Sequence, residues 1–187
     1  MAKTLAVEYR PKTFDDVVEQ EAVKRILQHQ IDTGTFKNAY LFTGAAGTGK
    51  TTSARIFASA INGGTEGMIE IDAASNNSID DIRGLTDMAK YKSLAGKYKV
   101  FVLDECHALS SASFQALLKI LEEPPALSIF ILCTTDPQKI PGTILSRVQR
   151  FDFKRITVKG IVDRLTEIVD EAEQVSAEAE ALNYIAV

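Results

Sequence analysis

Hydrophobic positions along the chain switch repeatedly between two spacings. Short apolar runs typical of buried strands occupy the segments 39–43, 68–71, 99–104, 129–134 and 151–153. Between these runs, apolar residues recur three and four positions apart, which is the spacing of an amphipathic helix. Strands that alternate with helices in this way indicate an α/β fold with a mainly parallel sheet.

The predicted helices share this spacing and end at recognisable signals. Gly34 stops the first helix, and the helix after segment 99–104 must end before the pair Pro124-Pro125. The apolar sets that mark the helices are Val23, Ile26, Leu27 and Ile31; Ala54, Phe57, Ala58 and Ile61; Ile79, Ile82, Leu85, Met88 and Ala89; and Phe114, Leu117, Leu118 and Leu121.

The pattern changes from Thr157 onward, where helices are no longer separated by strands. One helix carries the apolar set Ile161, Leu165, Ile168, Val169 and Ala172. A second helix opens near Ser176 and still has Leu182 and Ile185 on its apolar side, without a stop signal before the last residue. We therefore expect a main domain over residues 1–156, and the beginning of a second, truncated domain over residues 157–187.

Composition narrows the classes of protein. A net charge of −4 and a pI near 5.3 give no bulk electrostatic case for nucleic-acid binding. The longest apolar runs are too short to span a bilayer, so no membrane partner is expected. Cys106 and Cys133 have no second cysteine nearby, which fits a reducing compartment and predicts neither a disulfide framework nor a zinc site. The expectation is a cytoplasmic protein.

Residues 44–51 read GAAGTGKT, which matches the phosphate-loop pattern GxxxxGK[ST]. Glycines let successive backbone N–H groups turn toward phosphates, and the following helix adds its positive N-terminal end. Lys50 is expected to reach the β- and γ-phosphates of a nucleotide, and the Thr51 hydroxyl suits Mg²⁺. The motif follows an apolar strand and opens a periodic helix, which favours this interpretation over a glycine-rich turn with a stray lysine.

Residues 100–105 read VFVLDE, an apolar strand that ends in two carboxylates. In a parallel sheet these carboxylates would lie beside the phosphate loop. Asp104 would hold Mg²⁺, and Glu105 would polarise the water that attacks the terminal phosphate. The alternative is an acidic strand end that serves solubility alone.

Several longer segments resemble bacterial clamp-loader gamma/tau subunits. They are LFTGAAGTGKT at 41–51, DECHALSSASFQALLKILEEPP at 104–125, TTDPQKIPGTILSR at 134–147, the N-terminal Tyr9-Arg10-Pro11 with Phe14 to Val18, and Ile69 to Ser75. The resemblance covers nearly the whole chain in the correct order. It implies a three-layer AAA+ P-loop NTPase fold with a five-stranded sheet in the order 5-1-4-3-2, followed by a partial helical lid.

The resemblance also implies roles for residues that spacing alone does not identify. Thr135 falls on a polar sensor at the tip of the fourth strand, and Arg147 on an arginine finger that reaches the nucleotide of a neighbouring subunit. Their alternatives are a polar strand end and a surface salt bridge. The implied nucleotide-binding set is Gly44, Ala45, Ala46, Gly47, Thr48, Gly49, Lys50, Thr51 and Thr52, with Tyr9, Arg10, Val17 and Val18 at the adenine.

The residues expected at the adenine, Tyr9, Arg10, Val17 and Val18, have an alternative role, which is ordinary packing of the first helix. The chain also departs from the family in three ways. The linker 63–67 stands in place of a four-cysteine zinc module, so no zinc is expected. Glu19 stands where family members commonly have glycine. A second-domain arginine that senses the γ-phosphate falls beyond the last residue.

The resemblance implies an ATP-binding, Mg²⁺-dependent ATPase that drives loading of a sliding clamp onto primed DNA. The implied partners are other clamp-loader subunits, the sliding clamp, primed DNA and the polymerase core. Two alternatives stay open, namely a non-hydrolysing structural subunit of the same loader and a different AAA+ motor of replication or recombination.

Overall fold

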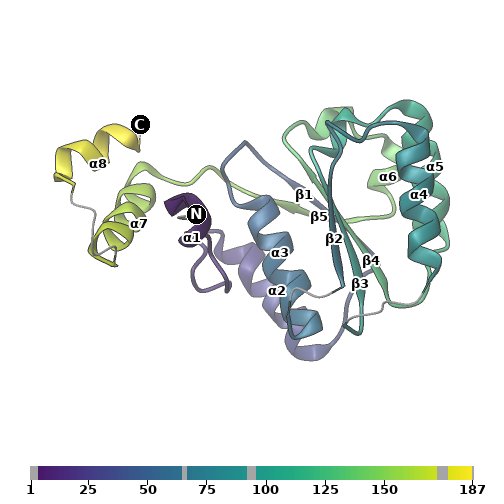
Figure 1. Ribbon diagram of the computed structural model, residues 1–187, viewed down its shortest axis with the longest axis horizontal. Coiled ribbons are helices and arrows are strands. Elements are labelled where there is room, and N and C mark those ends of the chain that lie inside the picture. Colours follow the sequence, from purple (N-terminus) through teal and green to yellow (C-terminus); the bar gives the residue numbers. More distant parts are fainter. Residues whose placement is uncertain (1–3, 65–66, 92–95, 172–176, 187) are drawn as a thin grey trace.

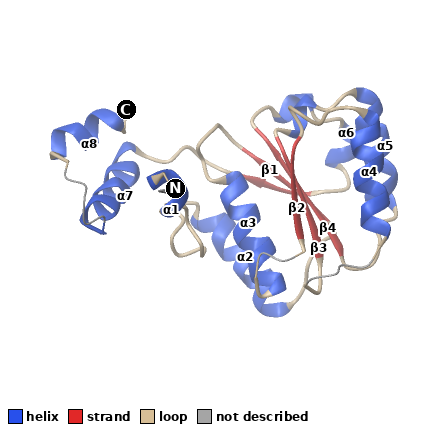
Figure 2. Cartoon of the chain, in the orientation of Figure 1, coloured by secondary structure: helices blue, strands red, loops and turns tan. Residues whose placement is uncertain are grey.

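The strands form one five-stranded parallel sheet in the order β2-β3-β4-β1-β5 (Figures 1 and 2). The structure is a computed structural model that describes residues 4–64, 67–91, 96–171 and 177–186. The observed order is 5-1-4-3-2 read from the opposite edge, so the expected sheet is confirmed. The strands are β1 (Ala39–Thr43), β2 (Met68–Asp72), β3 (Lys99–Asp104), β4 (Ser128–Thr134) and β5 (Gln149–Asp152).

Helices lie between successive strands, before the first strand and after the last. They are α1 (Leu5–Glu8), α2 (Glu21–Thr33), α3 (Lys50–Asn62), α4 (Ile79–Lys90), α5 (Ser111–Glu122), α6 (Gly142–Leu145), α7 (Val158–Glu171) and α8 (Ala179–Ile185), with short 3-10 turns at Cys106–Ala108 and Pro137–Lys139. The four-residue helices α1 and α6 have no counterpart in the apolar pattern, because four residues are too few to show a period. Ala172 and Ser176, which were expected in the last two helices, lie outside the described residues.

The central strands are buried on both faces, because helices cover the sheet from both sides (Figure 1). Side chains alternate across each strand, so β1 contributes to two separate cores. Ala39 and Leu41 pack with the helices α4, α5 and α6. Tyr40 and Phe42 pack with α2 and α3 on the opposite face. Burial of every β1 residue therefore fixes the strand that carries the phosphate loop.

Local signals set where the helices start and stop. Ser78 caps α4, where its hydroxyl accepts the Asp81 N–H while the Asp81 carboxylate accepts the Ser78 N–H, a complete capping box. Gly34 ends α2 in the left-handed conformation, with φ of 66°. The end of α2 at Gly34 matches the stop signal that the sequence predicts.

The carboxyl ends of all five parallel strands meet at one edge of the sheet, and the loops that follow β1, β3 and β4 share that edge. Helices α7 and α8 lie away from the sheet, on the side where α1 and the N-terminal end are found (Figure 1). Within the described ranges, every helix is too short or too polar to cross a bilayer.

Candidate functional site

The phosphate loop joins β1 directly to α3. Gly44, Gly47 and Gly49 have positive φ angles of 152°, 75° and 92°, and glycine adopts this region without a steric penalty. At Gly44 the requirement is also spatial, because a Cβ atom there would lie 2.5 Å from the carbonyl oxygen of Phe153. The segment after β5 therefore presses against the start of the loop.

Lys50 is the first residue of α3, and its side chain turns back into the loop. Its ammonium donates hydrogen bonds of 2.9 Å to the carbonyl oxygens of Gly44 and Ala45, and the residue is only 5% exposed. The Thr48 hydroxyl donates to the same Ala45 carbonyl at 2.9 Å. Thr52 follows in the first turn of α3 and is half-buried. The loop thus surrounds a buried cation, as a site for anionic phosphates requires.

Thr51 and Asp104 come together from α3 and β3. The Thr51 hydroxyl donates to Oδ2 of Asp104 at 2.7 Å, although the two residues are 53 positions apart. Mg²⁺ prefers oxygen ligands, usually one or two carboxylates with water and substrate phosphates. This hydroxyl and this carboxylate fit such a site beside the loop.

Glu105 follows Asp104 in the left-handed conformation, with φ of 47°. Its carboxylate oxygen Oε2 accepts the Thr135 hydroxyl at 2.8 Å and the Thr135 N–H at 3.3 Å. His107 Nδ1 lies 3.2 Å from the same oxygen and 3.2 Å from the Thr134 hydroxyl. The structure therefore brings together the expected base and the expected sensor, and places His107 beside them.

Both cysteines lie behind these carboxylates. Burial raises the pKa of the Cys133 thiol well above its usual value, and the nearby Asp104 charge adds to the effect. Burial also raises the pKa of Cys106, helped by the charges of Glu105 and Asp104. Both thiols are therefore held in the neutral form next to the acidic pair.

A cleft of about 720 Å³ opens beside the loop. Its lining residues are Val18, Ala45, Ala46, Gly47, Thr48, Arg155, Ile156, Val158, Ile161, Arg164, Leu165 and Ala186. One wall is thus the phosphate loop, and another is α7. Val18 and Ile161 give the cleft apolar surface, which a nucleotide base requires.

The other residues expected at the adenine lie in different places. Val17 is buried in the core beneath α2 and α3, as the packing alternative expects. The carbonyl oxygen of Tyr9 accepts a hydrogen bond of 3.3 Å from Arg164 of α7, which does line the cleft. Arg10 is exposed, and it is not one of the residues that line the cleft.

Gln20 is a site residue that the sequence did not identify. It is 8% exposed, and its amide nitrogen donates to the carbonyl oxygens of Thr48 at 3.3 Å and Lys154 at 2.6 Å. Its amide oxygen accepts the Lys154 N–H at 3.1 Å. Gln20 therefore links the start of α2 to the phosphate loop and to the segment after β5. Since these partners lie 28 and 134 positions away, no local sequence signal could have found them.

Arg147 lies just after α6, away from the phosphate loop of its own chain. Its guanidinium forms a 2.7 Å ion pair with Glu122 at the end of α5 and donates to the Thr143 carbonyl at 2.7 Å. This ion pair is the surface salt bridge that was the alternative to an arginine finger for Arg147. The side chain is 34% exposed, so a neighbouring molecule could still reach it. Its role across a subunit interface stays a prediction.

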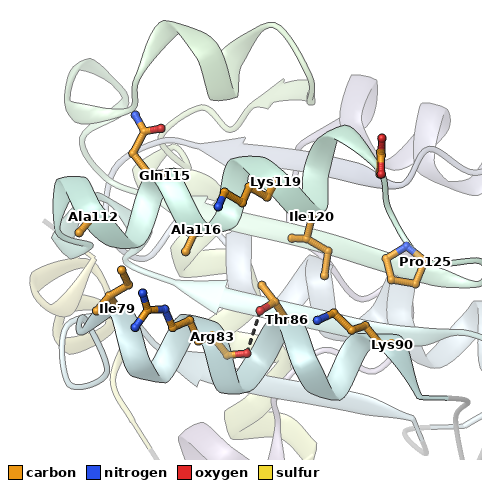
Figure 3. A pocket seen from close by; sticks show the side chains of 11 residues that line it. Ile79, Arg83, Thr86, Lys90, Ala112, Gln115, Ala116, Lys119, Ile120 and Pro125 are labelled. Atoms are coloured by element: carbon orange, nitrogen blue, oxygen red, sulfur yellow. Dashed lines mark hydrogen bonds between the residues drawn. The ribbon is translucent and has the colours of Figure 1, made fainter.

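A second hollow, of about 430 Å³, lies between α4 and α5 (Figure 3). Arg83 and Lys90 of α4 and Lys119 of α5 line it together with apolar residues. These helices cover the face of the sheet opposite α3. The groove contains none of the expected site residues, so it is separate from the phosphate loop.

Comparison with known proteins places the chain in a family. The family described as "DNA polymerase III, delta subunit" matches residues 68–157. DNA polymerase III subunit tau of Bacillus subtilis is 49% identical over 95% of this chain and 35% of its own length. The tau subunit of Salmonella typhimurium is 42% identical over 98% of this chain and 32% of its own length. The chain belongs to the DNA polymerase III tau/gamma family.

The chain spans about a third of the length of these tau subunits. Among solved structures, the Thermotoga maritima RuvB Holliday junction branch migration motor matches with a TM-score of 0.73 at 24% identity, over 95% of this chain and 59% of that chain. Likeness at this identity shows the fold alone. It agrees with the AAA+ P-loop architecture that the sheet order and the phosphate loop define.

Proposed function

We propose that this chain is the ATP-binding and ATP-hydrolysing motor subunit of the DNA polymerase III clamp loader. In this role it would drive the loading of a sliding clamp onto primed DNA. Membership of the tau/gamma family supports the proposal that the chain is a subunit of this clamp loader. The observation that carries the chemistry is the gathering of Lys50, Thr51, Asp104, Glu105 and Thr135 at one edge of the sheet.

Binding rests on the loop and the cleft. Backbone N–H groups of residues 44–51 and the N-terminal end of α3 would hold the phosphates, and Lys50 would neutralise their charge. The base would occupy the cleft between the loop and α7, against Val18 and Ile161. Thr51 and Asp104 would hold Mg²⁺, which when bound neutralises charge on the β- and γ-phosphate oxygens.

Hydrolysis requires a water molecule positioned beside the terminal phosphate. Glu105 would accept a proton from this water, and Thr135 would orient the Glu105 carboxylate through the hydroxyl contact described above. Arg147 would leave Glu122 and reach the nucleotide of the adjacent subunit. Residues 157–187 would form the beginning of the helical lid, and residues 1–156 the motor domain.

An assembly rebuilt with the partner subunits, sliding clamp and primed DNA tests this proposal. We expect the parent chain to bind the clamp with ATP and to release it on DNA. Lys50→Ala should do neither, and Glu105→Gln should bind the clamp without releasing it. Clamp binding by all three to the same extent, with the same release, would indicate a non-hydrolysing structural subunit. No clamp binding by any of them would indicate a different AAA+ motor.

A further inference from the structure

Glu19 and Gln20 form an unusual pair at the start of α2. Both have left-handed backbones, with φ of 56° and 59°, although neither is glycine. Residues with a Cβ atom seldom adopt this region, and they keep it only where other contacts compensate for the strain. For Gln20, the hydrogen bonds to the phosphate loop and to Lys154 compensate for the backbone strain. Glu19 needs a compensation of its own.

The Glu19 carboxylate reaches the N-terminal end of α7, 138 positions further along the chain. Its two oxygens accept the Thr157 N–H at 3.2 and 3.3 Å, and Oε1 also accepts the Thr157 hydroxyl at 2.6 Å. The Thr157 hydroxyl in turn accepts the N–H of Gly160 at 3.1 Å. Thr157 is thus the N-cap of α7, and Glu19 is bound to that cap.

These contacts reproduce a capping box with one member supplied from elsewhere in the chain. In the ordinary box the third helical residue carries the carboxylate that returns to the N–H of the cap, as Asp81 does in α4. In α7 that third residue is Gly160, which has no side chain. A Cβ atom on Gly160 would lie 2.7 Å from Glu19 Oε1. Gly160 therefore leaves the space that the Glu19 carboxylate fills.

This split capping box, formed by Glu19, Thr157 and Gly160, lies between two segments that line the cleft. Val18 precedes Glu19 and lines the cleft, and Val158 and Ile161 of α7 line it from the other side. Glu19 thus ties one wall of the cleft to the beginning of the other. Gln20 ties the same segment to the phosphate loop through Thr48. Two adjacent strained residues therefore connect the loop, the cleft and α7.

We propose that Glu19 is a positioning residue that holds α7 at the cleft, so that the affinity of the site for nucleotide depends on this carboxylate. The inference rests on the proposed function, because it takes the cleft to be the nucleotide site. Without Glu19, α7 keeps its Thr157 cap and the Arg164 hydrogen bond to the Tyr9 carbonyl, but loses the hydrogen bonds that join it to the segment after Val18. The wall formed by Val158 and Ile161 is then held less firmly against the bound base.

The variant Glu19→Gly separates positioning from general stability. Glycine removes the left-handed strain and also removes the cap contact, so the two effects on folding oppose each other. We expect the melting temperature without nucleotide to change by no more than about 2–4 °C. We expect the affinity for Mg·ATP, measured by calorimetry on the 187-residue chain, to fall about three- to tenfold.

Further variants test whether Glu19 acts through the α7 cap. Glu19→Gln keeps the length and one acceptor but loses the charge, so its affinity should fall between those of the parent and Glu19→Gly. Thr157→Val should weaken binding by a similar factor, and the double variant Glu19→Gly with Thr157→Val should be no weaker than either. Thr166→Val removes an exposed hydroxyl from the same helix and should leave affinity unchanged.

Amide hydrogen exchange without nucleotide tests the contact directly. The Thr157 N–H should exchange faster in Glu19→Gly than in the parent, and equal exchange would overturn the tether whatever the site binds. If the parent binds Mg·ATP, Lys50→Ala does not, and Glu19→Gly binds as tightly as the parent, the inference is wrong while the proposed function stands. No binding by the parent would contradict the proposed function, and with it the effect proposed for Glu19.

Discussion

Glu105 takes its position from Thr135, which follows β4, and from His107 in the turn directly after it. Its left-handed backbone turns the side chain out of β3, and Thr135 and His107 hold the carboxylate at that edge of the sheet. Asp104, one residue earlier, instead faces Thr51 of α3. Two adjacent carboxylates thus face different partners, which allows one to serve a metal and the other a water molecule.

Glu105→Gln is expected to bind nucleotide normally and to hydrolyse it slowly. An amide still hydrogen-bonds to water but cannot accept its proton, and loss of a general base costs about 10²–10⁴-fold in rate. Thr135→Val should reduce turnover by about tenfold, because it removes the hydroxyl that orients the carboxylate. Single-turnover phosphate release in the assembled complex measures both. Hydrolysis by Glu105→Gln at the parent rate would exclude Glu105 as the base.

The two thiols give a prediction that is independent of nucleotide. Burial raises the pKa of Cys106 and Cys133, and the thiolate is the reactive form. At pH 8 the folded chain should therefore show no reaction with a thiol reagent on the time scale on which free cysteine reacts. The same chain in guanidinium should expose both thiols. Rapid labelling of either cysteine in the folded chain would contradict the burial of the core behind Asp104.

At the scale of elements, the contact between the phosphate loop and the segment after β5 is the tightest constraint on the site. Gly44→Ala combines a positive φ with a Cβ atom placed 2.5 Å from a backbone oxygen of Phe153. We expect a loss of more than about 2 kcal/mol in the free energy of unfolding.

Gly34→Ala is the matched control for this change. Gly34 also has a positive φ, but a Cβ atom there would have nothing within 4 Å. Its cost should be about 1 kcal/mol, from backbone strain alone. Denaturant unfolding of both variants measures the difference. Equal losses would mean that β5 and the loop are not packed as the structure describes.

The strands could be predicted from the sequence, but the long-range contacts between elements could not. The strands β1, β3 and β4 follow from apolar runs, because burial between two helical layers leaves a strong signal. Shorter apolar runs also located the edge strands β2 and β5, although these strands are only partly buried. Strand ends were less accurate, and β5 covers 149–152 where 151–153 was predicted. Gln20 and Glu19 act on segments more than a hundred positions away, so only the fold brings them to their partners. The order of the strands came from family resemblance, since periodicity carries no information on sheet topology.

At the scale of the whole molecule, the proposed phosphoryl-transfer site depends on an arginine finger, and Arg147 is the residue that the family resemblance assigns to this role. Arg147 lies just after α6 and pairs with Glu122 at the end of α5. An arginine finger contributes about 10³–10⁵-fold to phosphoryl transfer. We therefore expect the isolated chain to hydrolyse ATP slowly even where it binds ATP well.

Mixing two inactive variants tests whether Arg147 acts between subunits. Arg147→Ala and Lys50→Ala are each expected to be inactive in assemblies with the partner subunits. When they are mixed, some interfaces join an intact phosphate loop to an intact arginine, and ATPase activity should partly return. If mixing adds nothing to the two separate activities, Arg147 acts within its own chain or serves only as the partner of Glu122.

Nucleotide binding at the phosphate loop is the claim on which the rest of the account depends, and calorimetric titration with Mg·ATP measures it directly. The parent chain should bind one nucleotide, and Lys50→Ala should give no heat, because it removes the buried cation of the loop. Lys37→Ala, which removes a lysine side chain on the exposed segment before β1, should bind like the parent. Binding by Lys50→Ala with the parent affinity, or no binding by the parent, would contradict the account.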